Sequence, residues 1–353
     1  MGPVSGGDGR RPAQLHRWAG QGAAAERASE RTRWAARQFI ACGALWALGA
    51  SSASAQTLEE LQDEIRESLG NTEFASYFAV LGLAASEYEL SGGSLEVDGT
   101  RLNRFALPYR RRWLEDDDRL GFYAEGVLGF ARAEESAEDL YSGAAPGFET
   151  SVEADWTTAG GLVGIGPIVR PAPDLTATWV ASVGLAHLES RARYAGPGAA
   201  VTQALLDGIG FNWEAWAGTV GSAGRLDWTR QLSSVLQAEA VLRYDLRWSR
   251  TLETDDPAQD FASRLQVLTL RGDLFGPTRW RCYGRTVDWR CYAGWQRFTE
   301  GSLLGETQIF ELGAGLELGL PAAIPWLREA VLNGALLLGE ELSGWSLGVS
   351  FGL

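Results

Sequence analysis

Apolar and polar residues alternate with a period of two over most of the chain, from residue 73 to the C-terminus. The alternation is cleanest in the segments 119–131, 234–249, 307–320 and 343–353. Successive side chains of a β-strand point to opposite faces of the sheet. The pattern therefore predicts strands with one apolar face and one polar face.

The segments between turn signals predict an all-β fold of about twelve strands, at 73–90, 99–113, 119–131, 152–166, 174–190, 213–229, 234–249, 261–274, 288–299, 307–320, 327–339 and 343–353. Short connections such as 115–118 and 171–174 alternate with longer ones such as 132–151 and 191–212. This alternation is typical of an up-and-down antiparallel transmembrane β-barrel, with short periplasmic turns and longer external loops. The barrel is expected to occupy residues 71–353.

The polar face of the strands distinguishes a barrel from a soluble sandwich. It carries charges of both signs, which are costly in a dry sandwich core but suit a wet lumen. The predicted lumen charge network consists of Glu125, Glu239, Arg243, Asp245, Arg247, Glu311 and Glu317. Tryptophans at strand ends are typical of interfacial girdles: Trp113, Trp228, Trp248 and Trp345.

A short amphipathic helix is predicted within residues 56–70, just before the strands. Leu58, Leu61, Ile65 and Leu69 share one face, and glutamates and aspartates occupy the other. Two positions are open for this helix, inside the lumen or as a periplasmic tail.

The N-terminal region reads as a targeting segment. Residues 31–55 combine three arginines, an apolar run over 39–50 and an Ala-Ser-Ala site before Gln56, which is typical of a cleaved signal peptide. Residues 1–30 are interpreted as an unusually long leader or an over-extended start. We therefore expect export to the outer membrane of a Gram-negative bacterium.

Charge and composition narrow the set of partners. The chain has a formal charge of −14, and all 31 of its basic residues are arginine. This charge argues against a nucleic-acid partner, which needs a basic surface. The expected partners are outer-membrane lipid and, during insertion, the barrel assembly machinery, and the expected state is a monomer.

Cys282 and Cys291 are the two cysteines that follow the signal segment. In an oxidising compartment they predict a disulfide that closes an enlarged periplasmic turn over 275–288. A zinc site is not expected, because the pair has no nearby histidine or second cysteine pair. No metal site and no cofactor is predicted.

The last nine residues, WSLGVSFGL, resemble the C-terminal insertion strand of outer-membrane proteins, with Trp345, Leu347, Val349, Phe351 and Leu353 on one face. That signal usually ends in an aromatic residue, whereas here Phe351 is third from last. The sequences of residues 78–90 and 102–113 resemble an opening hairpin. With the signal peptide and helix, this layout resembles the solitary outer-membrane autotransporter-like β-barrel family. The resemblance implies a translocator-type barrel without a passenger domain.

His187 is the one histidine beyond the signal segment and lies near the external end of its strand. It resembles the rim histidine of outer-membrane barrel lipases and proteases. Ser190 is three residues away and on the opposite face, so no local Ser–His pair can form. We expect a non-enzymatic barrel, either a narrow, porin-like channel or a structural, translocator-like one, with no catalytic residue. The alternatives are a barrel enzyme that uses His187 and a soluble exported β-sandwich that binds a ligand.

Overall fold

The computed structural model of the protein describes residues 57–68, 90–97, 100–114, 118–140, 149–282, 284–303, 306–319 and 329–352. The described chain is dominated by strands: β1 (Leu90–Val97), β2 (Thr100–Trp113), β3 (Leu120–Leu140), β4 (Thr150–Ala172), β5 (Leu175–Ala195), β6 (Trp213–Ser233), β7 (Leu236–Thr254), β8 (Ala262–Cys282), β9 (Arg285–Glu300), β10 (Gln308–Gly319), β11 (Glu329–Leu338) and β12 (Leu342–Gly352). The helical elements are α2 (Leu58–Ser68), α4 (Ala199–Leu206) and the short η1 (Pro257–Gln259). No helix in this part of the chain is long and apolar enough to cross a membrane.

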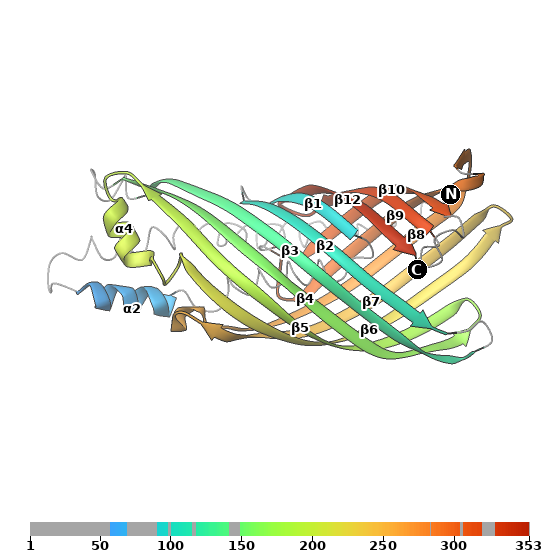
Figure 1. Ribbon diagram of the computed structural model, residues 1–353, viewed down its shortest axis with the longest axis horizontal. Coiled ribbons are helices and arrows are strands. Elements are labelled where there is room, and N and C mark those ends of the chain that lie inside the picture. Colours follow the sequence, from blue (N-terminus) through green and yellow to red (C-terminus); the bar gives the residue numbers. More distant parts are fainter. Residues whose placement is uncertain are drawn as a thin grey trace, which may run out of the picture.

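The twelve strands form one closed antiparallel barrel in which each strand pairs with its sequence neighbours (Figure 1). β1 and β12 close it, with Leu90 opposite Val349 and Val97 opposite Leu342. Both the fold class and the strand number predicted from the alternation are confirmed. A single closed sheet also excludes the β-sandwich alternative.

The first strand differs from the prediction. It was expected at 73–90, but β1 spans Leu90–Val97, and residues 69–89 lie outside the described part of the chain. Val97 pairs with Thr100, so the β1–β2 connection is the two-residue sequence Asp98-Gly99. Asp-Gly is a strong signal for a tight hairpin, and the apolar run before it drew the predicted strand too far upstream.

Side chains alternate between the outside and the lumen as the sequence predicts. On β3, Leu128 is 63% exposed on the outer face, whereas Glu125 is 8% exposed on the inner face. Large apolar residues cover the outside of almost every strand, among them Phe105, Val163, Val183, Val220, Leu270, Leu312, Leu336 and Leu347. A continuous apolar band around a closed barrel is the surface that a lipid bilayer covers.

The outer face also holds the predicted girdle and insertion-strand residues. Trp113, Trp248, Trp345 and Leu347 are exposed there, and Trp228 is partly exposed. The side chains of Phe351 and Leu353 lie outside the described part of the chain, as do the predicted leader 1–30 and signal peptide 31–55.

The two ends of the barrel differ in their connections. One end, the short-turn end, has tight turns at 173–174 and 234–235. The other, the long-loop end, has the connections 196–212, which contains α4, and 255–261, which contains η1. The predicted alternation of short and long connections is confirmed in part. The connection 339–341 at the long-loop end is short, and residues 132–140 of the predicted loop 132–151 belong to β3.

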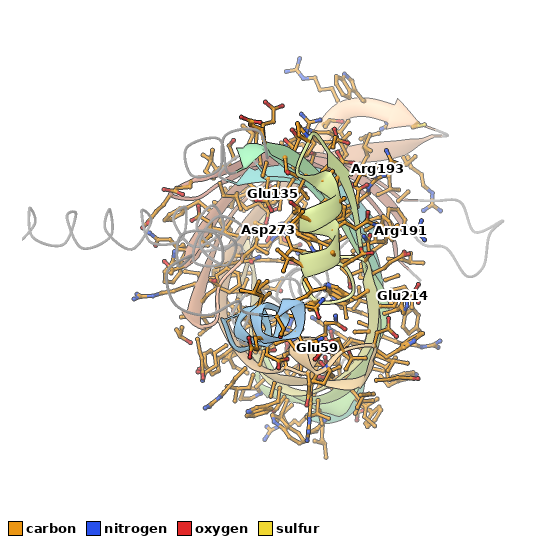
Figure 2. The ribbon with its side chains drawn as sticks, turned by 90° about the vertical axis from the view of Figure 1, so that its left-hand side faces the viewer. Glu59, Glu135, Arg191, Arg193, Glu214 and Asp273 are labelled. Atoms are coloured by element: carbon orange, nitrogen blue, oxygen red, sulfur yellow. The ribbon has the colours of Figure 1, made fainter. Side chains whose placement is uncertain are left out.

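The predicted helix forms as α2 and lies at the long-loop end (Figure 1). It contacts α4 and η1, and Ile65 packs against Leu205 and Ile209. Arg66 donates to both oxygens of Asp256, at 3.2 Å from Nε and 3.1 Å from Nη2. Figure 2 shows α2 nearly end-on beside α4 at the mouth of the barrel, where its contacts are with the loop elements α4 and η1. The side of the membrane that this mouth faces stays a prediction.

Candidate functional site

The lumen contains three copies of one short pattern, Arg-x-Asp, on three adjacent strands. They are Arg225/Asp227 on β6, Arg243/Asp245 on β7 and Arg271/Asp273 on β8. Residues two apart on a strand share a face, so each arginine and its aspartate point into the lumen together. All six residues are buried. Figure 2 places Asp273 within the ring of strands.

Arg243 is the centre of the largest cluster. Its Nη1 and Nη2 each donate to one oxygen of Glu125, both at 2.8 Å. Its Nε and Nη2 donate to the two oxygens of Asp245 at 2.8 and 2.9 Å. Arg247 adds a bond to Asp245 at 3.1 Å, and the Tyr123 hydroxyl donates to Glu125 at 3.0 Å. Every charge in this cluster faces an opposite charge, which buried charges require.

The bond between Glu125 and Arg243 crosses the lumen. Glu125 is on β3 and Arg243 on β7, and β4, β5 and β6 separate the two strands in the sheet. A second bridge joins strands equally far apart, since Nη2 of Arg112 on β2 lies 3.1 Å from Oδ1 of Asp227 on β6. These two transverse bridges run from wall to wall and narrow the lumen at their level.

Each arginine of the repeat also needs its own carboxylate. Arg225 and Arg243 lie directly opposite each other on β6 and β7. Like charges at such positions repel. Arg225 is balanced by two-pronged hydrogen bonding to Asp227, as Arg243 is by Asp245. The Arg-x-Asp pattern therefore lets three adjacent strands carry arginines into the same part of the lumen.

A third cluster lies on β8 and β9. Asp273 accepts hydrogen bonds from Arg271 at 3.1 Å and from Arg290 Nη2 at 2.7 Å. The Arg271 guanidinium stacks 3.7 Å from the centre of the Tyr292 ring, and the Tyr292 hydroxyl donates to Glu311 at 3.2 Å. The Tyr292 ring lies over Gly313, where even a Cβ would approach the ring to 2.1 Å. Glycine at this position is therefore required for the ring to lie there.

The predicted charge network is brought together only in part. Glu125, Arg243, Asp245 and Arg247 form one hydrogen-bonded cluster. Glu239 instead accepts from Gln237, and Glu311 belongs with Tyr292; Glu317 lies further along the inner face of β10. The prediction missed Arg112, Arg225, Asp227, Arg271, Asp273 and Arg290. The Arg-x-Asp pattern that recurs on neighbouring strands is the sequence signal for four of these residues, the pairs Arg225/Asp227 and Arg271/Asp273.

The lumen near the long-loop end is apolar, which the prediction of a polar inner face did not anticipate. Leu95, Leu102, Phe298, Ile309 and Leu337 form a buried cluster there on β1, β2, β9, β10 and β11. A second buried cluster on β5 and β6 includes Leu188 and Trp213. An apolar lining of this kind favours the exclusion of ions from the lumen between the long-loop end and the charged clusters.

His187 lies on the outer face and not in the lumen. Its ring packs 4.8 Å from the Trp216 ring centre, and its Nε2 is 3.6 Å from Oε2 of Glu214. Ser190 is buried on the inner face, so the predicted separation of the two residues is confirmed. In the described ranges, no group of three or more histidine, cysteine or acidic residues could hold a metal ion.

The predicted disulfide between Cys282 and Cys291 is not formed, and both thiols are free. In the β8–β9 hairpin, Cys282 at the end of β8 lies opposite Arg285, whereas Cys291 lies opposite Leu274. The two cysteines are thus roughly 25 Å apart along the strands at about 3.3 Å per residue. A disulfide requires Cα atoms within about 7 Å of each other. Segment 275–288 is two long strand ends and not an enlarged turn.

We expect both cysteines to react with a maleimide without prior reduction, because neither has a partner within bonding distance. The protein is treated with the maleimide first in the folded state and then after denaturation, and mass spectrometry of its tryptic peptides measures the labelling of each cysteine. A peptide pair linked through Cys282 and Cys291 in the non-reduced sample would contradict the register of β8 and β9.

The geometry defines the class of protein. A closed twelve-stranded antiparallel barrel with an apolar outer band and a charged lumen is a transmembrane β-barrel of the outer-membrane type. Twelve strands preceded by a short helix give the autotransporter-like layout that the sequence resembles.

Comparison with known proteins found structural likenesses alone, since no family model and no curated protein matches the sequence. The chain is similar to the β domain of the Bordetella autotransporter BrkA, with 13% identity, a TM-score of 0.45, and coverage of 74% of this chain and 96% of that one. It is also similar to the translocator domain of the autotransporter NalP from Neisseria meningitidis, with 14% identity, a TM-score of 0.44, and coverage of 79% and 97%. It is similar to the NanC porin as well, with 12% identity, a TM-score of 0.34, and coverage of 75% of this chain and 99% of that one. The fold assignment rests on the closed pairing of the strands and not on these likenesses.

Proposed function

We propose that the protein is a non-enzymatic integral barrel of the Gram-negative outer membrane whose lumen is narrowed by arginine–carboxylate bridges. It is exported by the signal peptide at 31–55 and inserted as a monomer by the barrel assembly machinery. Its role is that of a structural, translocator-like barrel, with at most a narrow passage for water and small ions.

The observation that carries this proposal is the bond from Glu125 to Arg243 across the lumen. The side chains are 8% and 4% exposed, so the pair is dry and held by charge-assisted hydrogen bonds. An open channel of porin type would instead leave its lining charges hydrated. The apolar clusters at the long-loop end reduce ion entry further.

No observation favours catalysis at His187. The described residues around it offer an indole and a carboxylate, and the nearest sequence serine faces the other way. A lipase or protease activity that disappears in His187→Ala would contradict the non-enzymatic part of the proposal.

The test is conductance in planar lipid bilayers, for the wild type and for a variant that lacks residues 58–68. Because the transverse bridges cross the lumen from one strand to another and do not involve α2, we expect no stable porin-sized channel in either protein. Removal of α2 deletes the helix at the mouth but leaves the Glu125–Arg243 bond in place. Stable channels in the wild type would contradict the proposal, and channels that appear only in the deletion variant would place the closure in α2.

A further inference from the structure

A groove on the outer surface of the barrel lies near the long-loop end, over β5 to β8. Its walls are the apolar side chains of Val183, Val220, Trp248 and Leu252, and Gly218 forms part of its floor. All four apolar residues are more than two-fifths exposed. Leu252 leans over the glycine, with a methyl group 3.1 Å from where a Cβ of Gly218 would lie. The groove thus has the apolar lining that an acyl chain of a surrounding lipid can contact.

Two arginines line the same groove, Arg250 on β7 and Arg264 on β8. Trp248 is opposite Arg264, and Arg250 is two residues further along, so the two cations lie on one face of adjacent strands. The Arg264 guanidinium is 5.6 Å from the Trp248 ring centre and its Nε is 3.0 Å from Glu300. Within the described ranges, no carboxylate is bonded to Arg250. The groove therefore combines an apolar trough with a cationic rim that is not fully neutralised.

This arrangement is complementary to an anionic lipid. The apolar walls match acyl chains, and the two guanidinium groups of the groove match a phosphate, which arginine binds through paired N–H donors. The Trp248 indole between trough and rim has the amphipathic character typical of the headgroup level. We propose that the groove is a specific binding site for the phosphorylated glycolipid of the outer leaflet. The inference rests on the proposed function, and the choice of leaflet rests on the expectation that the long loops are external, as is typical of outer-membrane barrels.

The test is native mass spectrometry of the detergent-purified full chain, titrated with bisphosphorylated lipid A, its dephosphorylated form and phosphatidylglycerol. We expect one lipid A molecule to bind per barrel. Phosphatidylglycerol offers one phosphate to the two guanidinium groups and dephosphorylated lipid A offers none, so both should bind at least about tenfold more weakly. The variant Arg250→Gln/Arg264→Gln should weaken lipid A binding by about tenfold or more.

Two further variants separate the site from general charge and from folding defects. Gly218→Leu fills the groove against the flexible Leu252 side chain and should also weaken binding. Arg111→Gln is the matched control, because Arg111 is another outward arginine over a tryptophan, 5.3 Å from the Trp113 ring centre, near the short-turn end. Heat-modifiable migration in gels confirms that each variant is folded. Equal affinity for dephosphorylated lipid A or for phosphatidylglycerol would overturn the proposal, as would equal losses in Arg111→Gln.

Discussion

Arg243→Ala is expected to lower the free energy of unfolding of the barrel by about 3–5 kcal/mol, because it removes the cationic partner of two buried carboxylates, those of Glu125 and Asp245. Both carboxylates are at most 8% exposed and each accepts two hydrogen bonds from this one guanidinium. Arg247 can still neutralise Asp245, whereas Glu125 keeps only the Tyr123 hydroxyl among the partners described. Urea unfolding in lipid vesicles, followed by tryptophan fluorescence, measures the loss.

The matched control is Arg132→Ala. Arg132 also contacts two carboxylates, Glu134 and Asp155, but its side chain is 47% exposed on the outer face. Exposed pairs contribute at most about 1 kcal/mol. If the two variants lose similar amounts of stability, the lumen cluster is hydrated and the description of a dry bridge is wrong.

The second large effect concerns passage through the lumen. Replacing Glu125 and Arg243 together by alanine removes one negative and one positive charge and deletes one transverse bridge. We expect the double variant to show stable single-channel steps in planar bilayers where the wild type shows none, because space and water replace the two side chains. The second bridge, Arg112 to Asp227, remains and should keep these channels narrow.

The control for this experiment is Arg132→Ala/Asp155→Ala. This pair also joins adjacent opposite charges, at 2.9 Å, but it lies on the outer face. It should leave the bilayer current unchanged. Equal currents in the two double variants would mean that the lumen pair does not control passage.

The sequence predicts most of the fold because a strand fixes the side of each residue with a period of two. The outward position of Leu128 and the inward position of Glu125 follow from the alternation along β3, without any knowledge of the strands that pair with it. The first strand was misplaced because the apolar residues before Leu90 alternate as strand residues do. The sequence signal that marks its true end is the Asp98-Gly99 pair between Val97 and Thr100. The disulfide failed for a related reason. The spacing of Cys282 and Cys291 does not reveal that β8 ends at Cys282 and that Cys291 lies within β9.

The candidate site could be predicted only within each strand. Arg243 and Asp245 are two residues apart, so their shared face follows from the sequence. Glu125 is 118 residues from Arg243, and their contact depends on the barrel diameter and on the strand stagger, which only the closed structure supplies. The apolar inner clusters were missed because an apolar residue such as Leu102 gives no sign of whether it faces lipid or lumen.

The central claim is that Glu125 and Arg243 contact each other across the lumen, and a double-mutant cycle measures that contact directly. The free energy of unfolding is measured for the wild type, Glu125→Ala, Arg243→Ala and the double variant. We predict a coupling energy of about 2–3 kcal/mol, in the upper part of the range for residues in one buried network. Losses that add to within about 0.5 kcal/mol, as for distant independent sites, would contradict the account.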